Sequence, residues 1–131
     1  MKHIALLFCL FFPILLFSQQ NSTKSTEQKK FEPINLWFVM LMKGTNRTQD
    51  STTAAKLQEG HMANINKMAA SGKLLVAGPF LEDANWRGVF ILKCDTKEEA
   101  ENLVKDDPAV KAGRLSYEIH PWMTGKNCLF N

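Results

Sequence analysis

One histidine stands in the middle of an otherwise apolar helical stripe. When residues 54–68 are drawn on a helical wheel at about 100° per residue, His61 lies at the centre of a hydrophobic face. Its neighbours on this face are Ala54, Leu57, Ile65 and Met68. The nearby polar residues are expected to point elsewhere: Asn64, Asn66 and Lys67. Because an amphipathic helix turns its apolar stripe toward the core, we expect the imidazole of His61 to be carried inward.

An inward-facing imidazole needs a hydrogen-bond partner, because an unpartnered buried polar group costs about 1–3 kcal/mol. Histidine is also well suited to moving protons at neutral pH, since its ordinary pKa is about 6.5. Two interpretations of His61 therefore stay open: a general acid or base that acts on a bound molecule, and a structural histidine with a buried hydrogen bond.

The composition limits the classes of function. The 131 residues are enough for one compact domain, and 45% hydrophobic with 22% charged residues is the balance of an ordinary globular protein. The formal net charge of +3 is spread along the chain, so we predict no nucleic-acid partner and no polybasic membrane patch. The sequence contains no nucleotide fingerprint, phosphate loop, nucleophile elbow or Cys-x-x-Cys pair, and we therefore expect neither a cofactor nor a bound metal.

Residues 1–18 have the layout of a secretory signal peptide. Lys2 gives a basic start, residues 4–17 form an apolar run that is short for a membrane span, and Ser18 is a small residue before a polar stretch. The polar residues 19–33 then predict a flexible linker. The sequence thus indicates an exported protein, periplasmic or secreted, with no membrane contact after leader cleavage. An uncleaved N-terminal anchor is the alternative.

Expression in a bacterium tests the export prediction. The mature chain is expected to begin close to Gln19 and to be found outside the cytoplasm, because cleavage follows a small residue at the end of the leader. N-terminal sequencing of the purified protein measures the cleavage point directly. A cytoplasmic protein that begins at Met1 would contradict export.

Export also affects how the cysteines are interpreted. Beyond the leader only Cys94 and Cys128 remain, an even number in a compartment that permits disulfides. Their spacing matches no known framework. A disulfide that ties down the C-terminal tail and a pair of free thiols therefore both stay open.

The rest of the chain alternates between strand and helix patterns. Strands are expected over 34–42, 73–77, 88–93 and 115–122, and helices over about 51–71 and from 97 to just before Pro108. This order is β-α-β-β-α-β, the ferredoxin-like arrangement of an α+β protein, with a four-stranded antiparallel sheet and two helices on one face. The domain is predicted to span residues 34–123, with a C-terminal tail over 124–131.

The first and third strands are uninterrupted apolar runs, and in this topology they lie in the middle of the sheet. Two helices cover only one face of such a sheet, so the other face needs a second cover. A second copy of the same sheet is the simplest cover. We therefore predict a homodimer that packs sheet to sheet.

Several short motifs follow one another in a distinctive order. They are His61, KLLVAGP at 73–79, Gly88 at the start of the third strand, EEA at 98–100, DPAVKAG at 107–113 and IHPW at 119–122. Together, over residues 36–122, they resemble the YciI-like (YCII-related) family, small single-domain proteins of the dimeric α+β barrel superfamily. The resemblance implies a ferredoxin-like fold and a sheet-to-sheet dimer, which the order of strands and helices also predicts.

The resemblance also implies a site. The family carries a characteristic histidine and aspartate, which fall on His61 and Asp107 here, and some relatives isomerise small ring compounds or eliminate groups from them without a cofactor. An aspartate that reaches the imidazole would fix its tautomer and raise its base strength. The matching motifs place Gly78, Pro79 and Trp122 among the substrate-binding residues. The implied function is that of a cofactor-free lyase or isomerase acting on a small organic ring compound.

Each of these assignments has an alternative. Asp107 could simply belong to a solvated acidic helix end before a proline. Trp37, Trp86 and Trp122 could line a cleft for a flat ligand or serve as core packing. A non-catalytic module that binds a small molecule in the same pocket is the alternative function.

Overall fold

The computed structural model describes residues 30–128. The predicted signal peptide (1–18), most of the predicted linker (19–33) and residues 129–131 lie outside this range. Within the described residues, no helix is both long and apolar enough to cross a bilayer. The elements are, in order, β1 Pro33–Lys43, α1 Ser51–Ala70, β2 Leu74–Pro79, β3 Trp86–Leu92, α2 Lys97–Lys105, α3 Pro108–Lys111 and β4 Leu115–Gly125, followed by a 3₁₀ turn at Lys126–Cys128.

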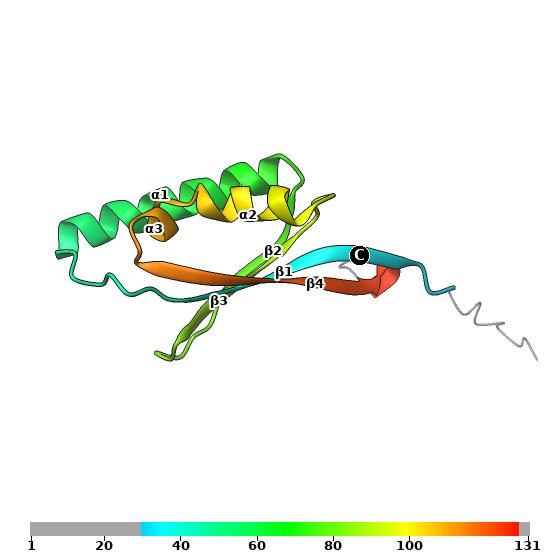
Figure 1. The fold of residues 1–131 in the computed structure, drawn as a ribbon, viewed down its shortest axis with the longest axis horizontal. Helices are drawn as coiled ribbons and strands as arrows, with labels where there is room; N and C mark the ends of the chain where they lie inside the picture. Colours follow the sequence, from blue (N-terminus) through cyan, green and yellow to red (C-terminus); the bar gives the residue numbers. More distant parts are fainter. Residues whose placement is uncertain (1–29, 129–131) are drawn as a thin grey trace, which may run out of the picture.

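The four strands form one antiparallel sheet in the order β2-β3-β1-β4. The helices lie together on one face of this sheet (Figure 1). The two most apolar strands, β1 and β3, occupy its centre, where both of their edges are paired. The predicted ferredoxin-like α+β arrangement is therefore confirmed.

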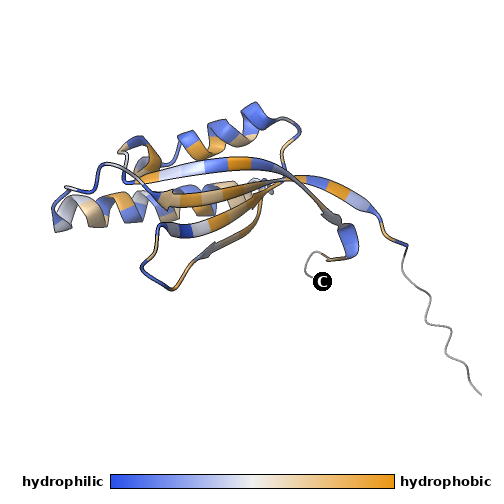
Figure 2. Cartoon of the chain, turned by 60° about the horizontal axis from the view of Figure 1, so that its bottom comes forward, coloured by the Kyte–Doolittle hydropathy of each residue, from blue (hydrophilic) through white to orange (hydrophobic). Residues whose placement is uncertain are grey.

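The side chains of β1 divide between the two faces of the sheet. Trp37, Val39 and Leu41 point toward the helices and pack with Phe90 and Leu92 of β3. The helices contribute buried side chains to the same core: Met68 of α1, and Ala100 and Val104 of α2. The even-numbered residues of β1 point to the opposite face, which no helix covers. Figure 2 shows the apolar character of the central strands and the striped polarity of the helices.

Side chains at the starts of α1 and α2 satisfy free backbone amides. Asp50 accepts a hydrogen bond from the amide of Thr53 (2.7 Å) at the start of α1. At the start of α2, Thr96 Oγ1 accepts from the amide of Glu99 (3.1 Å), and the Glu99 carboxylate accepts from the amide of Asp95 (3.0 Å). Thr96 and Glu99 thus form a capping-box arrangement in which the carboxylate reaches the amide of the residue before Thr96.

Both outer boundaries of the domain differ from the prediction. β1 begins at Pro33, inside the predicted linker, and β4 continues to Gly125, inside the predicted tail over 124–131. The two strands pair from Pro33 opposite Gly125 to Lys43 opposite Leu115, and they run on beyond the part of the sheet under the helices (Figure 1). Each strand supplies backbone hydrogen-bond partners to the other, which the local polarity of either segment does not reveal.

The two cysteines of the described residues are free thiols. Cys94 is buried and Cys128 is exposed. Burial raises the pKa of the Cys94 thiol, so this group stays protonated at neutral pH. Of the two alternatives that the sequence left open, the structure has the free thiols.

Candidate active site

α1 carries His61 on its inward stripe, as predicted. Met68 of the same stripe is fully buried, and Ile65 packs against the core. The side chain of His61 is 13% exposed, and its ring stacks on Phe90 of β3 at 6.0 Å between ring centroids. This stack holds the imidazole between the helix layer and the sheet.

The hydrogen-bond partner of the buried imidazole is Asp107. Nδ1 of His61 lies 2.8 Å from Oδ2 of Asp107, whose side chain is only 1% exposed. Both carboxylate oxygens are engaged further: Oδ2 also accepts from Nδ2 of Asn64 (3.2 Å), and Oδ1 accepts from the amide of Ala109 (2.9 Å). The structure therefore brings together the two residues that the family resemblance singled out.

The hydrogen bonds around Asp107 set the tautomer of His61. Burial raises the pKa of Asp107, but the hydrogen bonds from His61, Asn64 and the Ala109 amide, with the charge of His61, outweigh burial and hold this pKa below its ordinary value. An ionised carboxylate only accepts hydrogen bonds, so Nδ1 of His61 carries the proton that Asp107 accepts. In the neutral imidazole Nε2 is then the basic nitrogen. Nε2 has no hydrogen-bond partner among residues 30–128 and is accessible.

The short helix α3, which was not predicted, holds Asp107 in place. Asp107 is its N-cap residue, and Pro108 occupies its first position, where the fixed φ of proline suits a helix start. One carboxylate oxygen therefore caps α3 while the other faces His61. The interpretation of Asp107 as part of a solvated helix end is wrong, because the side chain is buried.

Gly60 allows α1 and α3 to approach each other. A Cβ at position 60 would lie 2.9 Å from Cγ of Pro108, too close to fit without a shift. Gly60 precedes His61 and Pro108 follows Asp107, so these contacting residues flank the hydrogen-bonded pair. Glycine inside a helix costs about 1 kcal/mol relative to alanine, and the close approach accounts for its presence here.

The Gly60→Ala variant is expected to weaken the contact between His61 and Asp107. The added methyl group displaces Pro108 and the Asp107 carboxylate with it, so the helix-propensity gain of about 1 kcal/mol should be lost or reversed. Thermal unfolding measures the change in stability, and the NMR resonance of the His61 Nδ1 proton reports the hydrogen bond.

The double variant Gly60→Ala/Pro108→Ala is the matched control, because it removes the ring atom that the new methyl group would meet. The double-mutant cycle should give a coupling of at least ~0.5 kcal/mol, with the alanine at position 60 better tolerated once the ring is gone. Strictly additive effects of the two substitutions would show that the approach of the helices does not depend on Gly60.

His61 lines a cavity of about 340 Å³ whose walls come from α1, α3 and the sheet. Its apolar lining is made by Leu41, Ile65, Phe90, Ala109 and Leu115. Part of the wall is bare backbone, since a Cβ on Gly88 would lie 2.8 Å from the carbonyl oxygen of Gly78 on the neighbouring strand. The volume is at the lower end of small-molecule sites and suits one small ring compound.

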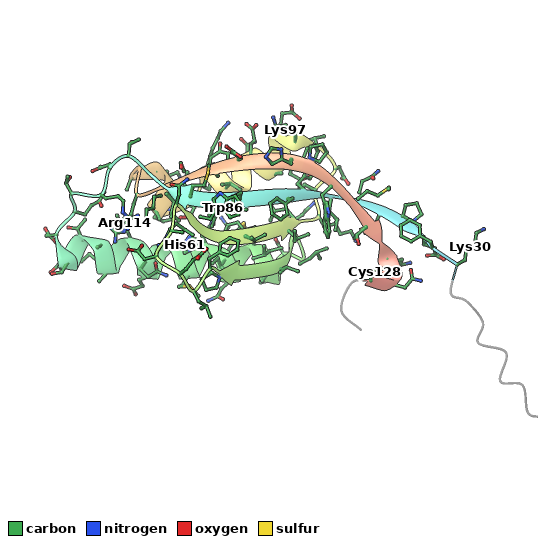
Figure 3. The ribbon with its side chains drawn as sticks, turned by 90° about the horizontal axis from the view of Figure 1, so that it is seen from below. Lys30, His61, Trp86, Lys97, Arg114 and Cys128 are labelled. Carbon is green, nitrogen blue, oxygen red and sulfur yellow. The ribbon has the colours of Figure 1, made fainter. Side chains whose placement is uncertain are left out.

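The polar part of the cavity lining is basic. Besides His61 it consists of Gln58 and three arginines, Arg47, Arg87 and Arg114. A register shift in the pairing of β1 with β3 leaves Arg87 without a partner residue on β1. Figure 3 shows Arg114 and His61 toward the same end of the molecule, away from the end at which Cys128 lies. Within residues 30–128, no three His, Cys, Asp or Glu side chains gather as a metal-ligand set.

Two of the three predicted substrate-binding residues lie at this cavity. Gly78 and Pro79 line it together with His61. Trp122 does not line it. It pairs with Leu36 on β1, and both residues point to the face of the sheet away from the helices. The placement of Trp122 beside His61 is therefore wrong within one chain, because the alternation along β4 turns it to the other side.

The other two tryptophans do not line the cavity either. Trp37 packs against the core and donates its indole N–H to the carbonyl oxygen of Cys94 (3.1 Å). Trp86 is 53% exposed. Of the two interpretations left open for the tryptophans, core packing holds for Trp37, and none of them forms a wall for a ligand of His61.

The prediction that Asn64 points away from the site is wrong, because its side chain donates to the carboxylate that also bonds to His61. Asn64 lies three residues after His61, so the two side chains share one side of α1 and reach the same carboxylate. This i, i+3 spacing was the available signal. The cavity arginines had no such signal, since Arg47 and Arg114 are 67 positions apart and only the fold makes them neighbours.

The fold and this site define a class of protein: a small ferredoxin-like α+β domain with a hydrogen-bonded histidine–aspartate pair between its helices and its sheet. The chain belongs to the YCII-related domain family, whose sequence model matches residues 36–123. The resemblance noted in the sequence is thus confirmed. A comparison with curated proteins finds no match.

Solved structures with a similar fold include two enzymes. One is 5-chloro-2-hydroxyhydroquinone dehydrochlorinase (TftG) from Burkholderia phenoliruptrix AC1100, in complex with 2,5-dihydroxybenzoquinone. The match has 24% sequence identity and a TM-score of 0.51, and it covers 70% of this chain and 97% of that chain. The other is muconolactone isomerase, at 10% identity over 66% of this chain and 86% of that chain, with a TM-score of 0.55. At these identities the likeness concerns the fold alone, which agrees with the predicted ferredoxin-like α+β class.

Proposed function

We propose that this protein is a cofactor-free enzyme that moves a proton on a small organic ring compound, as an isomerase or a lyase. One observation carries the proposal: Nδ1 of His61 is held by a buried, ionised carboxylate, while the ring lines a cavity of suitable size. A base oriented in this way is fixed in one tautomer and is stabilised when it becomes protonated. With the predicted leader removed, the enzyme would act outside the cytoplasm.

In the proposed reaction, Nε2 of His61 takes a proton from an acidic C–H or O–H group of the bound ring. The electron pair of the broken bond moves into the ring, and Asp107 stabilises the imidazolium through the hydrogen bond at Nδ1. In an isomerisation, the imidazolium returns the proton to a different ring atom. In an elimination, the electron pair expels a leaving group from the neighbouring atom, and His61 passes its proton to that group or to water.

The names of two similar structures support this reaction class. One is called a dehydrochlorinase of 5-chloro-2-hydroxyhydroquinone, and the other an isomerase of muconolactone. Elimination and isomerisation are both open to a single positioned base that acts on a ring compound. At 24% and 10% identity, these compounds serve as starting points for a search rather than as substrates of this chain.

We also propose that the active form is a homodimer packed through the uncovered face of the sheet. This face carries Phe38, Met40 and Met42 of β1, Val89 and Ile91 of β3, and the half-exposed Trp86 and Trp122. Large apolar side chains gathered on one face are typical of an interaction surface. A second copy of the same sheet offers a surface of matching character and closes the contact with two-fold symmetry.

A screen of the mature protein against lactones, halogenated phenols and hydroxylated quinones tests the proposed function. Absorbance and mass spectrometry follow product formation, and incorporation of deuterium from D₂O detects proton abstraction even where no product accumulates. Conversion or exchange that depends on His61 is the expected result. A compound that binds in the cavity but undergoes neither would favour the non-catalytic binding module.

A further inference from the structure

Two arginines in the cavity wall, which we call the arginine pair, have no carboxylate partner in the described part of the chain. Arg47 lies before α1 and Arg114 before β4, and both line the cavity with His61. Within residues 30–128 their side chains bond only to neutral oxygens: Arg114 Nη1 donates to Oε1 of Gln49 (3.1 Å), and Arg47 Nη1 donates to the carbonyl oxygen of Arg114 (3.1 Å). Because a guanidinium has five N–H donors, most of the donors of the pair remain available.

The third cavity arginine differs from the arginine pair. Arg87 forms an ion pair with Asp83 (2.9 Å), which also bonds to Lys43 (2.9 Å). No aspartate or glutamate is among the described residues that line the cavity, since Asp107 lies behind His61. The uncompensated positive charge of the cavity is therefore concentrated at the arginine pair.

The backbone holds the arginine pair together before any ligand binds. The amide of Gly44 donates to the carbonyl oxygen of Arg114 (3.0 Å), and the amide of Asn46 donates to that of Gly113 (2.9 Å). The two segments cross so closely that a Cβ on Gly44 would overlap the carbonyl group of Gly113. The segments that carry the two arginines are thus fixed to each other by the backbone, and a bound anion would be attracted by both positive charges.

We infer that the arginine pair is an anion subsite of this cavity and that the ring compound bound beside His61 carries a carboxylate. A planar guanidinium matches a carboxylate with two parallel N–H···O hydrogen bonds. With the carboxylate bound there, the ring is left to the apolar lining next to Phe90 and His61. The inference names the substrate class of the proposed function and rests on it for the reaction, although anion binding can be measured without turnover.

The surroundings favour a carboxylate over a phosphate. Phosphate sites commonly use backbone amides at a helix start. Here the start of α1 is capped by Asp50, and the amides of Gly44 and Asn46 already bond to the segment at Gly113 and Arg114. Side-chain donors alone are left, which suits the smaller and less highly charged anion.

Isothermal titration of the mature protein at low ionic strength with salicylate, salicylamide and phenyl phosphate tests the inference. Salicylate is expected to bind at least ~10-fold more tightly than its neutral amide, and added salt should reduce this difference. In the variant Arg47→Gln/Arg114→Gln the preference should disappear. The control Lys56→Gln/Lys67→Gln removes the same charge from exposed positions of α1 outside the cavity and should keep the preference. The single variant Arg47→Gln alters only an exposed side chain, and it should lower the preference without affecting folding.

Three results would overturn the inference. They are equal binding of acid and amide by the unmodified protein, no detectable salicylate binding up to ~10 mM, and an acid preference that survives loss of the arginine pair. Tighter binding of phenyl phosphate than of salicylate would transfer the subsite to phosphorylated ligands and contradict the carboxylate assignment. Acid-selective binding without proton exchange would instead contradict the proposed reaction and still support the anion subsite. Failure of the proposed function and failure of this inference are therefore distinguishable.

Discussion

Turnover is expected to fall at least ~100-fold when His61 is replaced by alanine, with the protein still folded. A positioned general acid or base contributes about 10²–10⁴-fold to a rate. No other described side chain in the cavity replaces it, because the remaining polar lining is arginine and glutamine. The buried Asp107 keeps its hydrogen bonds from Asn64 and from the amide of Ala109, so the loss of the imidazole does not leave it unpartnered.

The rate constant kcat and the melting temperature of His61→Ala, measured side by side, separate catalysis from structure. A catalytic histidine lowers kcat strongly and the melting temperature by a few degrees at most. Unchanged turnover in a folded His61→Ala protein would end the general-base interpretation. Loss of stability without any effect on turnover or ligand binding would leave His61 as a structural residue.

Asp107→Asn is the matched variant for the same prediction. Asparagine is a good N-cap residue and can still accept from the amide of Ala109, so α3 should persist. Its amide nitrogen would then face the donors of His61 and Asn64, and the imidazole must move its proton to Nε2 to accept instead. Because Nε2 is then no longer basic, activity should fall although the shape of the site is kept. Wild-type activity in this variant would show that Asp107 does not set the tautomer.

The Met40→Lys variant is expected to be monomeric at concentrations where the unmodified protein is a dimer. Met40 lies in the middle of the uncovered face, opposite Val89 on β3 and Glu118 on β4. A symmetric contact buries one ammonium group from each copy, and at about 2 kcal/mol for each the dissociation constant rises ~10³-fold. In the separate subunit the lysine reaches water and lies across from Glu118, so the fold should be kept.

Sedimentation equilibrium of both proteins measures the change in mass. Met40→Leu is the control, because it keeps an apolar side chain of similar volume and should leave the dimer intact. Circular dichroism of Met40→Lys checks that the subunit remains folded. A monomeric wild-type protein at micromolar concentration, or a lysine variant that still forms the dimer, would exclude packing through this face.

Much of the fold follows from periodicity in the sequence. The apolar runs around Val39 and Phe90 identified the central strands. In the last strand Leu115, Tyr117 and Ile119 alternate with more polar residues, a pattern typical of an edge strand with one face on the core. The inward position of His61 followed from a single helical wheel. These features are local, so a short window of sequence contains the physical reason for each of them.

The parts of the site that the sequence did not predict depend on contacts between distant segments. The family resemblance indicated Asp107, but α3 formed by Pro108–Lys111 and the burial of the carboxylate follow from the packing of that segment against α1. The neighbourhood of Arg47 and Arg114 arises from the antiparallel pairing of β1 with β4. Spacing along the chain does not contain that information. The family resemblance placed Trp122 at the site, but the alternation along β4 turns its side chain to the other face of the sheet.

The two carboxylate oxygens of Asp107 have different roles, one in folding and one in the proposed chemistry. One caps α3 and the other orients His61, so the aspartate is required by folding as well as by chemistry. Under the proposed function the imidazole is required by chemistry alone, since Asp107 keeps its hydrogen bonds from Asn64 and the Ala109 amide without it. A lineage that lost the reaction would therefore be free to change the histidine long before the aspartate and the proline after it. Under the proposed function, relatives that keep the aspartate but lack the histidine are expected to have lost the reaction and kept the fold.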